Sequence, residues 1–100
     1  MAVIRLANPK IITLEYFNKE STECSWARFK FDIDNNELFI ASSCGNFVFA
    51  AESVNKSFIK FCSEIKNHLF EKEISDVNVT DTDVITKIFC DFIQPKLKTM

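Results

Sequence analysis

The chain has 100 residues, of which 47% are hydrophobic and 26% charged, and its formal net charge is -2. This length suffices for one domain over residues 1–100 and leaves no room for a second hydrophobic core. The mildly acidic balance lacks the clustered basic face that attracts nucleic-acid backbones, so direct nucleic-acid binding is not expected. We find neither a signal-peptide pattern nor an apolar run of membrane-spanning length, so we expect a cytoplasmic protein without membrane association.

Alternating apolar and polar residues predict four strands in the first half of the chain. These strands are residues 11–17, 26–33, 38–42 and 47–50. The segments 34–37 and 43–46 between the last three strands are rich in Asn, Asp, Ser and Gly, which favour turns. Because short connections make neighbouring strands antiparallel, we predict an antiparallel β-meander of three to four strands within residues 16–50.

The apolar period changes after Ser53 from two residues to about 3.6, which is typical of helices. One apolar stripe predicts a helix from Ser53 to about Glu71, followed by a polar connection over residues 76–80. A second stripe predicts a helix that begins within residues 80–83, which supply an N-cap candidate, and ends at Pro95, because proline lacks the N–H that a helix interior uses. The expected fold class is therefore α+β, with the meander packed against two C-terminal helices around a core rich in phenylalanine.

The cysteines and the single histidine form no recognisable catalytic or metal-binding pattern. Cys24, Cys44, Cys62 and Cys90 are widely spaced, whereas zinc ligands in small domains usually come in close pairs. Two disulfides remain an alternative for a secreted protein, but without a signal peptide we favour buried, reduced thiols. We then expect that a reductant leaves the melting temperature unchanged. His68 has no positioned partner for acid–base work. We therefore expect no enzyme activity and no cofactor.

A cluster of acidic residues surrounds the expected connection between the two helices. Its members are Glu71, Glu73, Asp76, Asp81 and Asp83, with only Lys72 among them. One interpretation is a docking site for a basic partner, to which Glu73, Asp76, Asp81 and Asp83 would contribute. The other is a solvated loop beside a helix N-terminus, where the helix dipole favours acids. Neutral isosteres at these four positions should weaken binding and flatten its salt dependence if the first interpretation holds.

Strand alternation also places apolar residues on the face of the sheet that points away from the predicted helices. These residues are Trp26, Phe39, Ala41 and Val48, and an exposed face would normally be polar there. One interpretation is that residues 3–6 or the second helix cover this face within the chain. The other is that Trp26, Phe39 and Val48 form the centre of a homodimer or partner interface, since aromatic residues commonly anchor such patches.

The segment from Trp26 to Phe49 is similar to small phage and prophage proteins of largely unassigned function. The shared features are Trp26 with Phe29, an acidic turn, an apolar strand that leads to Ser42, then Gly45 and an aromatic strand. This resemblance implies a phage accessory protein of the host cell cytoplasm that acts by stoichiometric protein binding. That class includes inhibitors of bacterial defence complexes such as anti-CRISPR proteins, and the resemblance transfers no catalytic residue. A homodimeric structural or immunity-type protein is the alternative.

Overall fold

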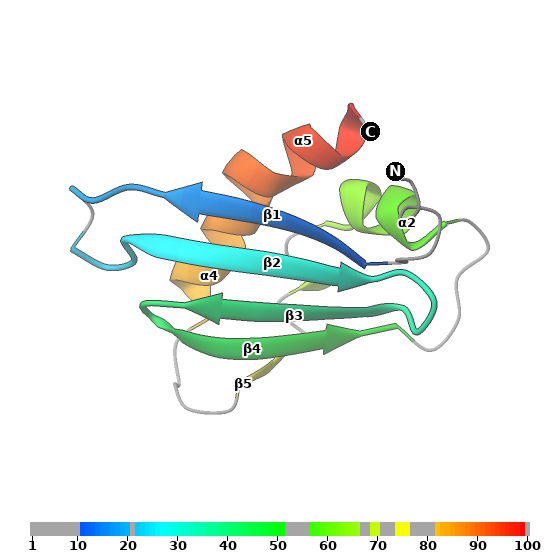
Figure 1. Ribbon diagram of the computed structural model, residues 1–100, viewed down its shortest axis with the longest axis horizontal. Helices are drawn as coiled ribbons and strands as arrows, with labels where there is room; N and C mark the ends of the chain where they lie inside the picture. The colour runs from blue at the N-terminus through cyan, green and yellow to red at the C-terminus, as the bar shows by residue number, and fades with distance from the viewer. Residues whose placement is uncertain are drawn as a thin grey trace, which may run out of the picture.

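The fold is an antiparallel sheet with helices on one side, seen in a computed structural model that describes residues 11–20, 22–51, 57–66, 69–70, 74–76 and 82–99, with residues 75 and 76 described by their backbone alone. The strands are β1 (Ile11–Phe17), β2 (Trp26–Asp32), β3 (Glu37–Ser42), β4 (Gly45–Ala50) and β5 (Ile74–Asp76). They lie in the sheet in chain order, and every neighbouring pair is antiparallel (Figure 1). The predicted meander is therefore confirmed for β1 to β4.

Both predicted turns have the backbone geometry that their residues favour. In the turn from β2 to β3, Asn36 has a φ of 54°, which Asn tolerates better than most residues. Asn35 donates its backbone N–H to Asp32 Oδ1 at 3.3 Å in the same turn. In the turn from β3 to β4, Gly45 has a φ of 133°, a value open to glycine because it lacks a Cβ. Local chemistry thus fixes where the strands reverse.

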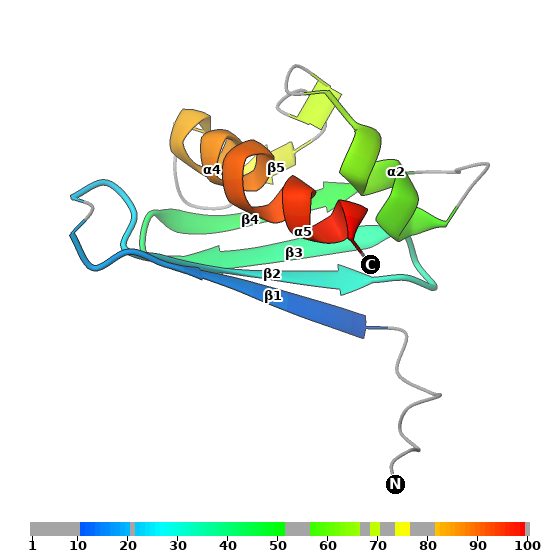
Figure 2. The ribbon, with the colours of Figure 1, turned by 90° about the horizontal axis from the view of Figure 1, so that it is seen from above.

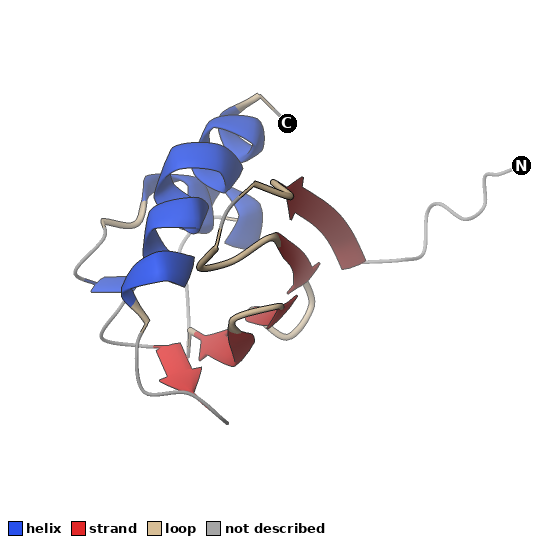
Figure 3. Ribbon diagram, turned by 90° about the vertical axis from the view of Figure 1, so that its left-hand side faces the viewer, coloured by secondary structure: helices blue, strands red, loops and turns tan. Residues whose placement is uncertain are grey.

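The helical elements lie together on one face of the sheet, and the opposite face carries none of the described helices (Figures 2 and 3). They are α2 (Phe58–Glu64), α4 (Asp83–Ile88), a π-helical turn η1 (Phe89–Ile93) and α5 (Gln94–Lys98). The predicted α+β class with helices at the C-terminal side of a meander is confirmed. Among the described residues, no helix has both the length and the apolar character needed to cross a membrane.

The first predicted helix is interrupted: α2 forms only part of it, and residues 69–70 are helical again after a break at Ile65 and Lys66. The α2 segment begins after Ser57, whose Oγ accepts the N–H of Lys60 at 3.2 Å, as serine does at helix starts. It ends before Ile65, which has extended backbone angles, φ -67° and ψ 141°. Two side chains donate hydrogen bonds to backbone carbonyls near this end. Ser63 donates to Lys60 O, and Gln94 donates to Cys62 O and Ile65 O. These bonds compete with continuation of the helix.

The second predicted helix does not stop at Pro95, so that expectation is wrong. The helix changes from α to π geometry in η1, where the N–H of Gln94 donates to the carbonyl of Phe89, five residues earlier. Pro95 then lies in the first turn of α5, a position at which proline is tolerated. The π turn therefore lets a helical path continue past a proline.

Strand β5 was not predicted, and it changes the position of Asp76. The sequence analysis placed Asp76 at the start of a polar connection, but its backbone pairs with Phe47 of β4. Only three residues form this strand, which is too short to show an alternating pattern in sequence. Within the described part of the chain the sheet therefore has five strands, with β1 at one edge and β5 at the other.

The core between the sheet and the helices consists largely of phenylalanine, as the composition predicted. Seven of the eleven phenylalanines are almost completely buried: Phe29, Phe31, Phe47, Phe49, Phe58, Phe70 and Phe89. Phe70 and Phe89 stack with ring centroids 4.1 Å apart. Phe49 lies 5.3 Å from Phe70 and connects this pair to the sheet. Offset and tilted ring pairs of this kind add to the free energy of simple apolar burial.

Candidate protein-binding site on the outer sheet face

The candidate site is the outer face of the sheet, which is the face opposite the helices. Trp26 and Phe39 both point to this face, and each is 38% exposed. Val48 and Ala41 lie on the same face and are half-buried. The predicted orientation of these four residues is therefore confirmed, whereas their role in binding is a matter for experiment.

Strand register gathers four apolar side chains of the outer face into two cross-strand pairs. Phe39 lies opposite Val48 on β3 and β4, near the middle of the sheet. Phe17 lies opposite Trp26 on β1 and β2, at one end, and Phe17 is 75% exposed. Opposing side chains in an antiparallel pair have Cβ atoms about 5 Å apart, so each pair is a contiguous apolar surface. We call these four residues the outer patch.

Sequence analysis missed Phe17 as a member of the outer patch. It placed Phe17 in the first strand but assigned no face to that strand. The signal needed is the register, which sets Phe17 directly opposite Trp26. Opposing residues in a sheet share a face, so knowledge of the β1–β2 pairing alone would have identified it.

A charged row separates the two halves of the outer patch. Arg28 Nε donates to Glu15 Oε2 at 2.9 Å, and the two side chains are 55% and 62% exposed. An ion pair this exposed contributes little to stability, so both groups can exchange partners at low cost. Lys30, which lies opposite Phe39, adds a second basic group beside the apolar residues.

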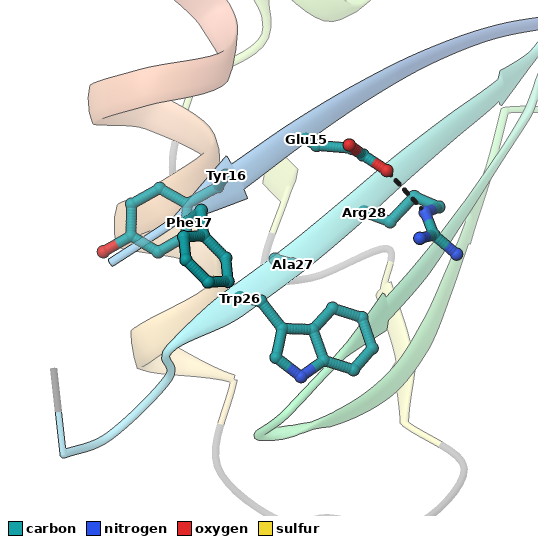
Figure 4. Close-up of a pocket in the computed structure, with 6 residues that line it drawn as sticks. All are labelled: Glu15, Tyr16, Phe17, Trp26, Ala27 and Arg28. Carbon is teal, nitrogen blue, oxygen red and sulfur yellow. Dashed lines mark hydrogen bonds and ion pairs between the residues drawn. The ribbon is translucent and has the colours of Figure 1, made fainter. Parts of the chain in front are cut away.

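A hollow of about 410 Å³ lies at the Phe17 end of the outer patch. Its lining residues are Glu15, Tyr16, Phe17, Trp26, Ala27 and Arg28. Figure 4 shows the rings of Phe17 and Trp26 as neighbours here, with the Glu15–Arg28 ion pair farther along the strands. An apolar hollow with a few polar groups at its rim is a common form of recognition site.

The backbone of Trp26 is held firmly at the start of β2. Its carbonyl oxygen accepts the N–H of Ser43 at 3.1 Å and the Sγ–H of Cys24 at 3.3 Å. Cys44 in turn donates its Sγ–H to Cys24 Sγ at 3.0 Å. Burial raises the pKa of Cys44 to about 11, so this thiol stays protonated at neutral pH. Such anchoring fixes the backbone from which the indole projects, so this part of the chain need not be ordered when a partner binds.

The expectation that the second helix covers the outer face is wrong. The helical segments α4, η1 and α5 all pack on the opposite face (Figure 2). Their apolar side chains pack in the core on that face, where Ile85, Phe89 and Ile93 are fully buried. The other predicted cover, residues 3–6, lies outside the described residues.

The predicted acidic cluster is only partly within the described residues. Asp83 is exposed at the first turn of α4, and the backbone of Asp76 lies in β5. Glu73 and Asp81 lie outside the described ranges, as does His68. The structure therefore does not bring these acids together into one described surface, and the docking interpretation stays a prediction.

The cysteines are thiols, and Cys62 is the most deeply buried of those with a perturbed pKa. Burial raises the pKa of Cys62 to about 12. Within the described ranges, no three His, Cys, Asp or Glu side chains come together as possible metal ligands. No family model, curated protein or solved structure matches this chain.

Proposed function

We propose that this protein acts by stoichiometric binding to another protein through the outer patch. The observation that carries this proposal is an aromatic sheet face with no described helix over it, on which Trp26 and Phe39 are each 38% exposed. Partly exposed aromatic residues on a rigid element bury a large apolar area and lose little side-chain entropy on binding. The outer patch therefore supplies anchors of the kind that dominate binding energies.

The chemistry of the outer patch indicates what a partner surface should offer. Apolar side chains would meet Phe39 and Trp26, and acidic groups would meet Arg28 and Lys30, which lie beside these apolar residues. Exposed charges at an interface mainly raise the rate and specificity of association. The resemblance of the Trp26–Phe49 segment to phage proteins supports a bacterial defence complex such as CRISPR–Cas as the target. Inhibition would then follow from occlusion of a working surface of that complex, as in anti-CRISPR proteins.

The test uses Phe39→Ser and Trp26→Ala in the full-length protein, with Leu69→Ser as the matched control. Leu69 is an exposed aliphatic residue outside the sheet, at 44% exposure. The assays are plating of a targeted phage on cells with active CRISPR–Cas and co-elution with the purified complex in size-exclusion chromatography. Wild type and Leu69→Ser should rescue the phage and co-elute, whereas the two outer-patch variants should lose both activities.

The fold of each variant is measured alongside by urea denaturation. Phe39→Ser should leave the protein folded, because the Phe39 side chain already contacts water and none of the described helices packs on it. If both outer-patch variants are folded and still rescue the phage, the proposed site is wrong. If wild type itself forms a dimer that Phe39→Ser dissociates, and binds no defence complex, the outer patch is a homodimer interface instead.

A further inference from the structure

Strand β1 is an edge strand of the sheet, and half of its backbone N–H and C=O groups point away from the other strands. Asn18 donates its N–H to the carbonyl of Ser25, directly opposite, at 2.7 Å. In antiparallel strands such hydrogen-bonded pairs alternate along the ladder, so Tyr16, Leu14 and Ile12 direct their N–H and C=O groups toward β2. The groups that point outward belong to the alternate residues Ile11, Thr13, Glu15 and Phe17.

A hollow of about 270 Å³ lies between this edge and the C-terminal helix. It is lined by Glu15, Tyr16, Phe17, Asn18, Phe92 and Lys96. The rings of Tyr16 and Phe92 lie 4.9 Å apart, and Phe92 is 49% exposed. Lys96 is exposed one turn farther along the helix. Backbone groups that have no partner strand among the described residues therefore lie next to an apolar hollow with a cation at its rim.

We propose that the β1 edge binds an extended segment of a partner protein, which joins the sheet as a sixth strand. The N–H and C=O groups of Thr13, Glu15 and Phe17 would pair with this segment. Its residue opposite Tyr16 would be apolar and would fill the hollow beside Phe92. An acidic residue close to it in sequence would reach Lys96. Strand addition of this kind takes affinity from backbone pairing and specificity from alternate side chains.

The arrangement of the helix favours a single strand over a second copy of this chain. Figures 1 and 3 show α5 extending beyond β1 on the helical side of the sheet. A lone strand beside β1 packs its inward side chains on this helix. A second copy would bring its own α5 into the same space. The proposal is independent of the outer patch and its partner.

The experiment selects short random peptides displayed on phage against the full-length protein and synthesises the best binder. We expect it to carry an apolar residue near an acidic one. Each residue of this peptide is then N-methylated in turn, which removes one N–H without changing the protein. Methylation should weaken binding about tenfold at every second residue and change it little at the others, because only alternate N–H groups face β1.

Three protein variants locate the peptide on the edge. Thr13→Pro removes an outward N–H while the β1–β2 bonds use the neighbouring residues, and proline is tolerated at such edge positions. It should weaken binding about tenfold or more, whereas Thr13→Val, which keeps the N–H, should not. Lys96→Glu should reverse the preference from acidic to basic peptides, a readout that does not depend on proline in β1.

Several outcomes would overturn the proposal. Failure to enrich any peptide, or N-methyl effects without alternation, would exclude strand addition. Loss of binding in Phe39→Ser but not in Thr13→Pro would move the peptide to the outer patch. A wild-type dimer in solution that Thr13→Pro dissociates would put a second copy, and not a partner segment, at this edge.

Discussion

The hydroxyl of Thr86 is buried in α4 and has no hydrogen-bond partner in the described structure. Burial of an unsatisfied hydroxyl costs about 1–3 kcal/mol, and valine has nearly the same shape without this group. We expect Thr86→Val to raise the free energy of unfolding by about 1 kcal/mol. Urea denaturation measures the change. Thr13→Val, at an exposed position, is the control and should change stability by less than about 0.5 kcal/mol.

A stability no greater than that of wild type in Thr86→Val would show that this hydroxyl has a partner in solution. The direction of the change is therefore informative, because most substitutions in a core destabilise the protein.

Cys62 makes the protein sensitive to alkali. Burial raises its pKa from 9.0 to about 12, so the folded state holds the proton after the unfolded state has released it. The contribution of the protonated thiol to the free energy of unfolding is fully present below pH 9. It is lost as pH rises toward 12, by about 4 kcal/mol in total. Cys44, whose pKa is raised to about 11, contributes in the same direction.

The measurement is urea denaturation from neutral pH to about pH 11. Cys62→Val removes the titrating group at nearly constant volume, so its stability should fall less steeply with pH than that of wild type. A further Cys44→Val substitution should flatten the curve again. Equal slopes in wild type and Cys62→Val would mean that water reaches this thiol in the folded state.

At the scale of the elements, one side chain joins the two helical regions. Gln94 Nε2 donates to the carbonyls of Cys62 at 3.0 Å and Ile65 at 2.6 Å, at the end of α2. Helix ends leave carbonyls without partners inside the helix, so Gln94 satisfies groups that α2 cannot. We expect Gln94→Ala to lower the free energy of unfolding by about 1–3 kcal/mol, measured by urea denaturation.

Gln94→Glu tests whether the loss comes from the missing donor. It keeps the shape of the side chain but sets a carboxylate against two carbonyl oxygens, so it should destabilise at least as much as alanine. If glutamate restored wild-type stability, packing and not hydrogen bonding would explain the role of Gln94.

The same bonds explain why the helices were harder to predict than the strands. Alternation in β2, β3 and β4 is local, and it correctly assigned Trp26, Phe39 and Val48 to the outer face. The end of α2 depends on Gln94, about thirty residues away, and no periodicity within α2 contains that information. Pro95 is read locally as a helix stop, whereas the π turn before it lets the helix continue.

At the scale of the whole molecule, the two candidate surfaces differ in how much of each could be predicted from local sequence patterns. Alternation within single strands was enough to predict Trp26, Phe39 and Val48 as members of the outer patch. Prediction of Phe17 required the register between β1 and β2. The hollow at the β1 edge was not predictable, because Tyr16 and Phe92 come together only when the C-terminal helix packs on the sheet. The binding role of either surface also depends on the side chains of the partner, which are not part of this sequence.

The order of the strands also has a consequence for synthesis on the ribosome. Because each strand pairs with the next one along the chain, β1 to β4 need only local contacts, which form fast. Their phenylalanines must then wait for Phe58, Phe70 and Phe89 to leave the exit tunnel before that face is covered. A nascent chain stalled between β4 and α4 would expose an aromatic sheet surface, the kind of intermediate that chaperones bind and that aggregates without them.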